Sequence, residues 1–257
     1  MRLTLPLFLL AYLCACAAVN AQSAPDGRTA QPERPTVATH AWTVAPGFAE
    51  LETGVEWDRN QDRSYGFSTP SVLKLGLQRR VQLGLFGGVN AASGVTLGAG
   101  DAGAVVKIRL LDDSPVLGGF AVMPGIKFPT GRTSHGTNTT DGSLVLISSH
   151  RLGPVALDLN AGYTRRSGDG TSAPRNATVW TISTGGPIAG PIGFAAEVFG
   201  YPGTSGPAAA RGSVALLAGP VITIRPWAVV DAGAIIRLRG DQPHAVYSGL
   251  VYNFGKF

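Results

Sequence analysis

Residues 48–57 read FAELETGVEW, and apolar and polar side chains alternate through this stretch. Leu51, Val55 and Trp57 fall on one face of an extended chain, while Glu50, Glu52 and Glu56 fall on the other. A period of two residues is typical of a β-strand that has one apolar and one polar side. The pattern returns in three similar stretches, VLKLGLQ (72–78), AGAVVKIRL (102–110) and VALDLNAGY (155–163). We therefore expect an all-β protein.

The composition narrows the class of β protein. Only 14% of the residues are charged, against about 25% in soluble proteins, and 35 of the 257 residues are glycine. Beyond Val19 no apolar run approaches the ~18 residues of a transmembrane helix, which excludes a helical membrane protein. The net charge of +5 is not concentrated in a lysine-arginine cluster, so nucleic acid is not an expected partner.

The N-terminus has the layout of a secretory signal peptide. Arg2 precedes an apolar run that ends at a small-residue site, so we expect a signal peptide at 1–21, with lipoprotein processing at Cys16 or a membrane helix as alternatives. The only cysteines, Cys14 and Cys16, lie in this segment, so the mature chain has no disulfide. Residues 22–42 lack any hydrophobic period and are predicted to be a flexible periplasmic N-terminal tail.

The remaining residues, 43–257, contain about twelve alternating stretches and no helix-period stretch. Strands of about ten residues have membrane-spanning length. Long polar connections, such as those at 90–101 and 129–142, alternate with short ones. Outer-membrane barrels have short periplasmic turns and longer extracellular loops. The sequence therefore predicts a transmembrane antiparallel up-and-down β-barrel of about twelve strands in the bacterial outer membrane, in contact with outer-membrane lipid.

The last residues, SGLVYNFGKF (248–257), alternate and end in an aromatic side chain. In a closed barrel the last strand pairs with the first and does not fray. We expect the barrel-assembly machinery to recognise this strand. Phe254 shares a face with Leu250 and Tyr252, whereas Phe257 has the opposite parity, so the sequence leaves open which aromatic is the assembly signal.

The chain resembles the outer-membrane family named "MetA-pathway of phenol degradation", whose members are regarded as transporters. Four short motifs carry the resemblance: GDAGAVVKIRLLDD (100–113), GIKFPTG (125–131), GPVALDLNAGYT (153–164) and GLVYNF (249–254). Three residues follow Phe254, where the family pattern would end. The resemblance implies a barrel for uptake of aromatic or other small organic compounds, and no transport residues can be carried over.

The polar face of each strand should line the lumen, because charges are costly against hydrocarbon. The candidate lumen-lining residues are Glu50, Glu52, Glu56, Lys74, Lys107, Arg109, Lys127, Asp158, Glu197, Asp231 and Arg237. Opposing charges could form a selective filter, with Lys107, Arg109 and Lys127 attracting carboxylates or phenolates. Alternatively, the charges could form internal ion pairs that fill a narrow barrel. Glycines on the same face, such as Gly54 and Gly76, argue for open space or for strand curvature.

The predicted function is a channel for passive uptake of small organic solutes, aromatic compounds among them. The sequence has no nucleotide-binding loop and suggests neither a plug domain nor a cofactor. The loop at 129–142 could fold inward as a constriction or extend as a mobile extracellular loop. His135 within it has no ligand partner nearby, so no metal site is predicted. The alternatives are an adhesive or structural barrel and a lipid hydrolase that uses Ser148 and His150.

Overall fold

The computed structural model describes residues 27–132 and 134–257, so the expected signal peptide lies outside the described residues. The described chain forms one antiparallel sheet of fifteen β segments. Its segments are β1 (Phe48–Arg59), β2 (Tyr65–Ser68), β3 (Ser71–Gln78), β4 (Val81–Gly87), β5 (Val89–Ala92), β6 (Val95–Ala99), β7 (Ala102–Ser114), β8 (Gly118–Phe128), β9 (Asp141–Leu152), β10 (Val155–Arg166), β11 (Asn176–Ala189), β12 (Ile192–Tyr201), β13 (Ser213–Arg225), β14 (Ala228–Arg239) and β15 (His244–Lys256). None of the described residues belongs to a helix long and apolar enough to cross a membrane.

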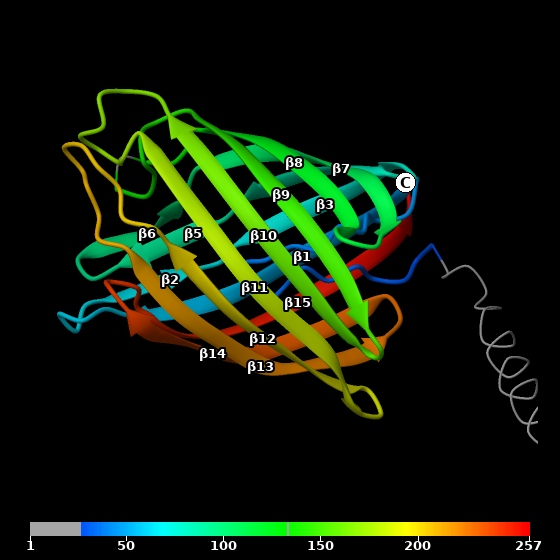
Figure 1. Cartoon of the computed structure of the whole chain (residues 1–257). Helices are drawn as coiled ribbons and strands as arrows, with labels where there is room; N and C mark the ends of the chain where they lie inside the picture. Colours follow the sequence, from blue (N-terminus) through cyan, green and yellow to red (C-terminus); the bar gives the residue numbers. More distant parts are fainter. Residues whose placement is uncertain (1–26, 133) are drawn as a thin grey trace, which may run out of the picture.

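The sheet closes on itself because β15 pairs with β1 along its whole length, from Phe48↔Lys256 to Arg59↔His244. Three wall strands are broken in two: β2 continues into β3, β4 into β5, and β6 into β7. The fifteen segments therefore form twelve strands, and the predicted fold of a closed twelve-stranded antiparallel barrel is confirmed. Figure 1 shows the tilted strands around a single axis.

The three breaks lie side by side in neighbouring strands. Pro70 lies between β2 and β3, Gly88 between β4 and β5, and Gly100 between β6 and β7. Proline has no N–H to donate to a ladder, and glycine weakens a strand interior. Residues 90–101, which we predicted to be a long loop, instead form most of a hairpin, β5–β6, with a tight turn at Ser93 and Gly94. Gly94 has φ +80°, a conformation that favours glycine.

The two ends of the barrel differ. Five turns of two or three residues, at 79–80, 115–117, 153–154, 190–191 and 226–227, lie at the end where β1 begins and β15 ends, here called the turn end. The opposite, loop end carries the longer connections at 60–64, 129–140, 167–175, 202–212 and 240–243. In Figure 1 the loop end is on the left and the C-terminus marks the turn end on the right.

A β-bulge near the C-terminus decides the parity of its aromatic side chains. The register changes from Glu50↔Asn253 to Ala49↔Gly255, and Gly255 has φ +105°. One extra residue on the bulged strand reverses the parity of everything beyond it. Phe257 therefore shares the outer parity of Phe254, and both side chains are more than half exposed. The conflict of parity seen in the sequence is resolved by the bulge.

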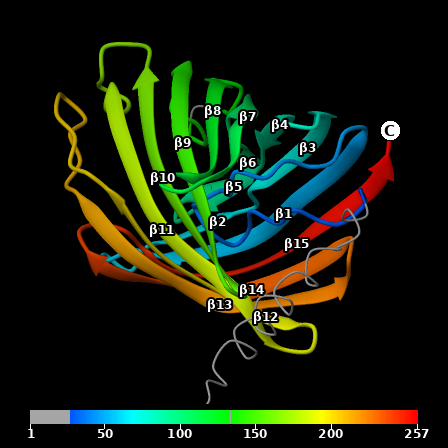
Figure 2. The same cartoon turned by 45° about the vertical axis from the view of Figure 1, so that its right-hand side comes forward.

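The segment before β1 lies inside the barrel. We predicted a flexible periplasmic tail at 22–42, but the structure places residues 27–46, here called the luminal segment, against the inner wall. Figures 1 and 2 show this segment in dark blue, inside the ring of strands. This segment has no hydrophobic period, and it is held by hydrogen bonds to side chains of the wall. Such hydrogen bonds leave no pattern in the sequence from which they could be predicted.

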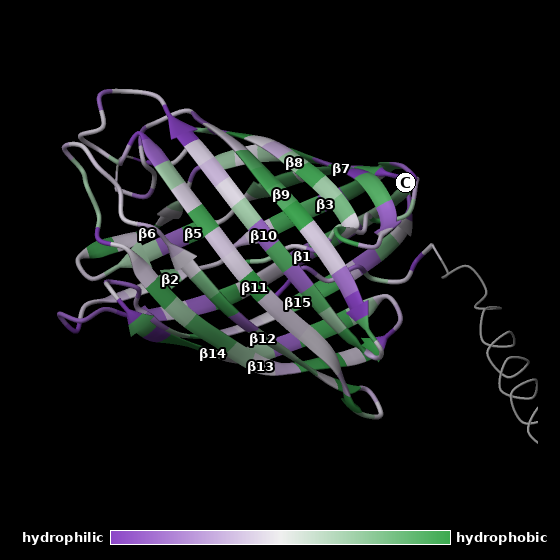
Figure 3. Ribbon diagram, viewed as in Figure 1, coloured by the Kyte–Doolittle hydropathy of each residue, from purple (hydrophilic) through white to green (hydrophobic). Residues whose placement is uncertain are grey.

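The two faces of the wall differ in polarity, as Figure 3 shows in the alternating colours along each strand. Large apolar side chains such as Ile182, Leu238 and Val246 are half exposed or more on the outer face. Buried polar side chains such as Glu50, Lys107 and Asn253 lie on the inner face. This arrangement is the reverse of a soluble protein and suits a wall with lipid outside.

Candidate functional site

The luminal segment is bound mainly through its backbone. Seven of its N–H groups donate hydrogen bonds of 2.7–2.9 Å to side-chain oxygens of the wall. The pairs are Gln31–Glu50, Glu33–Glu52, Val37–Glu197, Ala38–Glu197, Thr39–Asn160, Ala41–Ser149 and Val44–Gln82. Backbone groups must be satisfied when water is excluded, and here the wall supplies the acceptors. The polar inner face is therefore complementary to one particular path of the chain.

Lys74 is the centre of a buried ion cluster on β1 and β3. Its Nζ lies 2.7 Å from both the Glu50 and the Glu52 carboxylates. The same ammonium donates to the Gln31 carbonyl at 2.6 Å. All three charged side chains are buried, and Lys74 and Glu50 are fully buried. The three predicted lumen residues Glu50, Glu52 and Lys74 are thus brought together, and they bind the luminal segment.

Lys107 on β7 makes a second buried cluster. Its ammonium forms an ion pair with Glu33 and donates to Thr39 Oγ1 at 2.7 Å and to the His40 carbonyl at 2.8 Å. Burial by itself would raise the pKa of Glu33, but Lys107 and Lys74 outweigh it and hold that pKa well below its usual value. Burial and the Lys107 charge lower the pKa of His40 to about 3. The segment therefore carries a charged Glu33 and a neutral His40 while it is inserted.

Glycines on the inner face make room for the luminal segment. A Cβ atom at Gly54 or Gly249 would overlap the guanidinium of Arg34, which is paired with Asp231 on β14. A Cβ atom at Gly76 would overlap the backbone carbonyls of the segment near Ala45. The sequence suggested open space or curvature at Gly54 and Gly76, and the structure shows that the space is occupied.

Arg109 lies apart from Lys107, at the turn end of the lumen. It pairs with Asp112 at 3.0 Å and donates to the Arg79 carbonyl at 2.9 Å. Its guanidinium also lies 5.0 Å from the ring centroid of Trp42, and Arg151 lies 6.0 Å from the same ring. Trp42 of the luminal segment is thus held between two cations at the periphery of the lumen.

Lys127 is at the loop end, where it anchors the connection between β8 and β9. Its ammonium lies 2.6 Å from Asp101 and donates to the Thr139 carbonyl at 2.9 Å. Asp101 in turn accepts from the N–H groups of Gly131 and Thr137 at 3.1 and 3.0 Å. Of our two interpretations of this loop, its described residues support the inward constriction, because they are tied to the inner wall.

The other four candidates occupy separate positions around the lumen. Asp158 accepts from Ser149 at 2.5 Å on the turn side. Arg237 donates to the Gln242 carbonyl at 3.2 Å near the loop end. Glu56 lies in register with Tyr247 and has no ion pair among the described residues. The fourth, Glu197, accepts hydrogen bonds from the backbone N–H groups of Val37 and Ala38. The three cations of the suggested filter do not form one cluster, and each has its own acidic partner.

An apolar patch inside the barrel escaped the sequence analysis. Phe199, Leu217, Ile235 and Tyr247, from β12 to β15, form one buried cluster on the inner face. The register identifies the face, because Leu217 pairs directly with Glu197 and Tyr247 with Glu56. These side chains lie on the same face of the wall as the charged residues. The alternation along each strand was therefore the signal that could have placed them in the lumen.

Ser148 and His150 form only part of a hydrolytic site. The Ser148 Oγ and the His150 Nε2 are 2.9 Å apart, and Ser148 also donates to the Leu117 carbonyl. Among the described residues no carboxylate forms a hydrogen bond with His150, so the third member of a triad is missing there. The geometry does not favour the lipid hydrolase.

Cavities lie near both ends of the barrel. Three adjoining cavities at the turn end, of about 360, 370 and 560 Å³, each have residues of the segment in their lining, such as His40 and Trp42. A cavity of about 440 Å³ at the loop end is lined by Asp58, Asn90 and His135 and shares no lining residue with the others. Each is large enough for a small organic molecule.

Solved structures with the same fold are outer-membrane barrels. The COG4313 outer membrane channel from Pseudomonas putida F1 is 14% identical, with a TM-score of 0.67, and the match covers 86% of this chain and 100% of that one. The fold is that of a twelve-stranded outer-membrane β-barrel. A KdgM porin (12% identical, TM-score 0.55, 79% and 99% covered) and the translocator domain of the autotransporter NalP from Neisseria meningitidis (9%, 0.51, 80% and 88%) are also similar. At these identities the likeness concerns the fold alone. No family model and no curated protein matches the chain, so the resemblance to the phenol-degradation family stays a prediction.

Proposed function

We propose that the protein is an outer-membrane channel for passive entry of small organic solutes, aromatic compounds among them, and that the luminal segment is its gate. The observation that carries this proposal is the path of the segment, which runs inside the wall and lines all three turn-end cavities. With the turn end in the periplasm, solute enters the loop-end cavity and passes when the segment moves. The apolar patch around Phe199 and Tyr247 suits organic solutes better than sugars.

The contacts of the luminal segment are compatible with a gate that is bound to the wall and can be released from it. Its partners are mainly polar, so water can replace them when the segment leaves the wall. The net contribution of a hydrogen bond to a charged group is only about 1.5–3 kcal/mol. The wall itself closes through β1 and β15 without any residue of the segment. Release of the segment therefore leaves the barrel intact.

A disulfide between the segment and the wall tests the gate. Ala41 N and Ser149 Oγ are 2.8 Å apart, which keeps the two Cα atoms within about 7 Å of each other, the upper limit for a disulfide. No other cysteine follows position 16, so A41C/S149C gives a single lock. The oxidised variant in liposomes should pass phenol and benzoate no faster than empty liposomes do, and reduction should restore wild-type flux.

The single variant A41C under the same oxidant is the matched control. Equal flux through locked and reduced barrels would show that solute passes without movement of the segment. If neither wild type nor reduced barrels pass any of phenol, benzoate or a sugar of similar size, the protein is not a channel for these solutes. Faster passage of the sugar than of phenol would contradict the proposed solute class.

A further inference from the structure

The outer face of the barrel carries a row of side chains near the loop end. Trp180, Gly200, Val214 and Arg239 are successive register partners across β11, β12, β13 and β14. On β11 the neighbour Thr181 is buried on the inner face, while Ile182 is 50% exposed on the outer face, so Trp180 points outward. A Cβ atom at Gly200 would lie 2.6 Å from the Trp180 ring, so the glycine makes space for the indole.

A register shift turns Arg239 to the outside. On β14, Arg237 pairs with Ala215, whereas Arg239 pairs with Val214, so Leu238 is an extra residue in the ladder. Without the shift Arg237 and Arg239 would share a face. With it, Arg237 stays on the side of the buried Ala215, and Arg239 joins the outward row.

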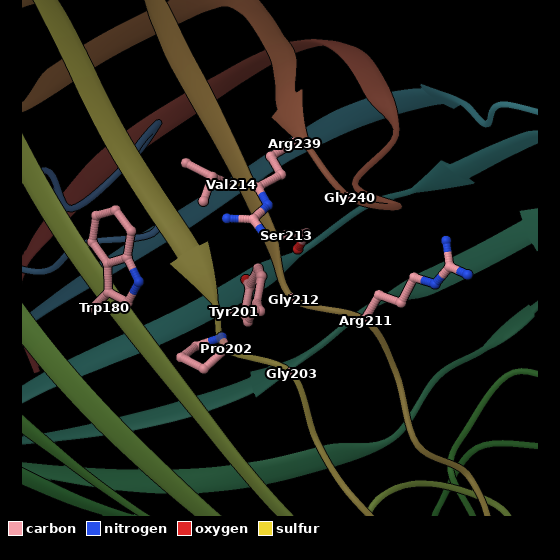
Figure 4. A pocket seen from close by; sticks show the side chains of 10 residues that line it. All are labelled: Trp180, Tyr201, Pro202, Gly203, Arg211, Gly212, Ser213, Val214, Arg239 and Gly240. Atoms are coloured by element: carbon pink, nitrogen blue, oxygen red, sulfur yellow. The ribbon is translucent and has the colours of Figure 1, made fainter.

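A pocket of about 680 Å³ opens beside this row. Figure 4 shows Trp180, Tyr201, Val214, Arg211 and Arg239 around it, with Arg211 contributed by the connection between β12 and β13. Both arginines are exposed, and within the described chain neither guanidinium has a hydrogen bond or an ion pair. The nearby Asp241 pairs with neither. Arg211 and Arg239 thus line one cavity, and neither has a charged partner in the described chain.

The surface on the turn-end side of the pocket is apolar. Ile182 and Ile236 are 50% and 48% exposed on the outer face of β11 and β14. Tryptophan is enriched where the hydrocarbon core meets the headgroups, and Trp180 lies between the apolar surface and the two arginines. The arginines are therefore at the height of lipid headgroups when the barrel is in a membrane.

We propose that this pocket binds a phosphorylated lipid of the outer leaflet, with its phosphate at Arg211 and Arg239 and its acyl chains along Trp180, Ile182 and Ile236. Arginine binds phosphate oxygens through two parallel hydrogen bonds, and two arginines match a doubly charged phosphate monoester. The inference rests on the outer-membrane location proposed above and is independent of the gate and of the solute.

Native mass spectrometry of the folded barrel with lipid A tests the site. The probes are lipid A with its phosphates, dephosphorylated lipid A, and inorganic phosphate. We expect wild type to retain phosphorylated lipid A, and R211Q/R239Q to retain at least fivefold less. The control R225Q removes an exposed arginine at the turn end of β13 and should bind as wild type does. Dephosphorylated lipid A should bind wild type as weakly as the intact lipid binds the double variant.

Equal retention by the double variant, R225Q and wild type would overturn the proposal. Inorganic phosphate that displaces lipid A at equal molar concentration would show a free-anion site and would also overturn it. Heat-modifiable migration of each variant shows that the barrel is folded, which we expect because both side chains are exposed. W180A should lower retention of lipid A less than the double variant does, since it removes an acyl-chain contact and keeps both cations.

Discussion

The guanidinium of Arg34 lies 3.4 Å from the carboxylate of Asp231, so the luminal segment is paired with β14 inside the barrel. Gly249 on β15 provides the space, because the three atoms nearest to a Cβ there all belong to Arg34. The wall is thus shaped for this side chain. Substitutions at this contact should therefore displace the segment without disturbing the pairing of the strands.

Gly249→Val should displace Arg34 and weaken insertion of the luminal segment while the barrel stays closed. The segment can be followed through A41C, because Ala41 is fully buried when inserted and a membrane-impermeant thiol reagent labels it only after release. We expect labelling of A41C to be at least fivefold faster in the Gly249→Val background. Gly142→Ala is the matched control, since nothing lies within 4 Å of a Cβ there. Unchanged labelling in Gly249→Val would contradict the role of this space.

Lys107→Gln should open the channel to anionic and neutral solutes alike. The substitution leaves Glu33 without its cation, and a buried charge that loses its partner costs about 3–5 kcal/mol. Benzoate and phenol flux in liposomes should therefore rise together. Lys127→Gln, which frees the loop at 129–140, should leave labelling of A41C unchanged. A loss of benzoate flux without a change in phenol flux would instead support Lys107 as a selectivity residue.

Acid should release the luminal segment through His40. Its pKa is about 3 when inserted and near 6.5 when released, so insertion is fully favoured above pH 6.5 and loses stability as the pH falls towards 3. Glu33 acts in the same direction only below its usual pKa of 4.5, because its pKa is lowered on insertion. Each pH unit below 6.5 is worth up to about 1.4 kcal/mol, so release should rise roughly 25-fold between pH 7 and 5. Because the thiolate is the reactive form, labelling of A41C is divided at each pH by that of R225C, a cysteine at an exposed position.

His40→Asn should abolish this rise between pH 7 and 5, because the substituted side chain does not titrate. Exposed His244 is the control position, and His244→Asn should keep the wild-type pH dependence. The charged groups facing His40 are Lys107, Glu33 and Lys74, and none has a usual pKa inside this pH window. A wild-type rise in the His40→Asn variant would assign the acid response to another group.

Truncation from Tyr252 onward should prevent assembly. It removes the β15 residues that pair with Leu51 to Phe48 and the aromatic contact between Tyr252 and Trp227, whose ring centroids lie 5.3 Å apart. Removal of Gly255 to Phe257 alone keeps that contact and should leave heat-modifiable protein in the outer membrane. Loss of assembly in the shorter truncation would identify Phe257 as the signal, and normal assembly in the longer one would show the end of β15 to be dispensable.

The alternation of side chains predicted the wall well, because a strand with an apolar outer face and a polar inner face must keep the period of two. It predicted the faces of β1 and β3, where Glu52 and Lys74 do meet. It did not reveal the bulges at Leu238 and Gly255, which shift parity through one extra residue. Nor did it reveal the luminal segment, since donors such as Ala38 and Thr39 are backbone groups that any residue provides. The sequence identified the acceptors only as polar residues on the inner face of their strands; they are Glu197, Asn160, Ser149 and Gln82.

The luminal segment also constrains the order of assembly. Its partners come from β1, β3, β4, β7, β9, β10, β12 and β14, which span most of the chain. Contacts between residues far apart in sequence form late, after the intervening chain has been ordered. The first part of the described chain is therefore among the last to reach its final position. Burial of Ala41 then indicates a finished barrel, and the lumen of an incomplete barrel lacks the segment.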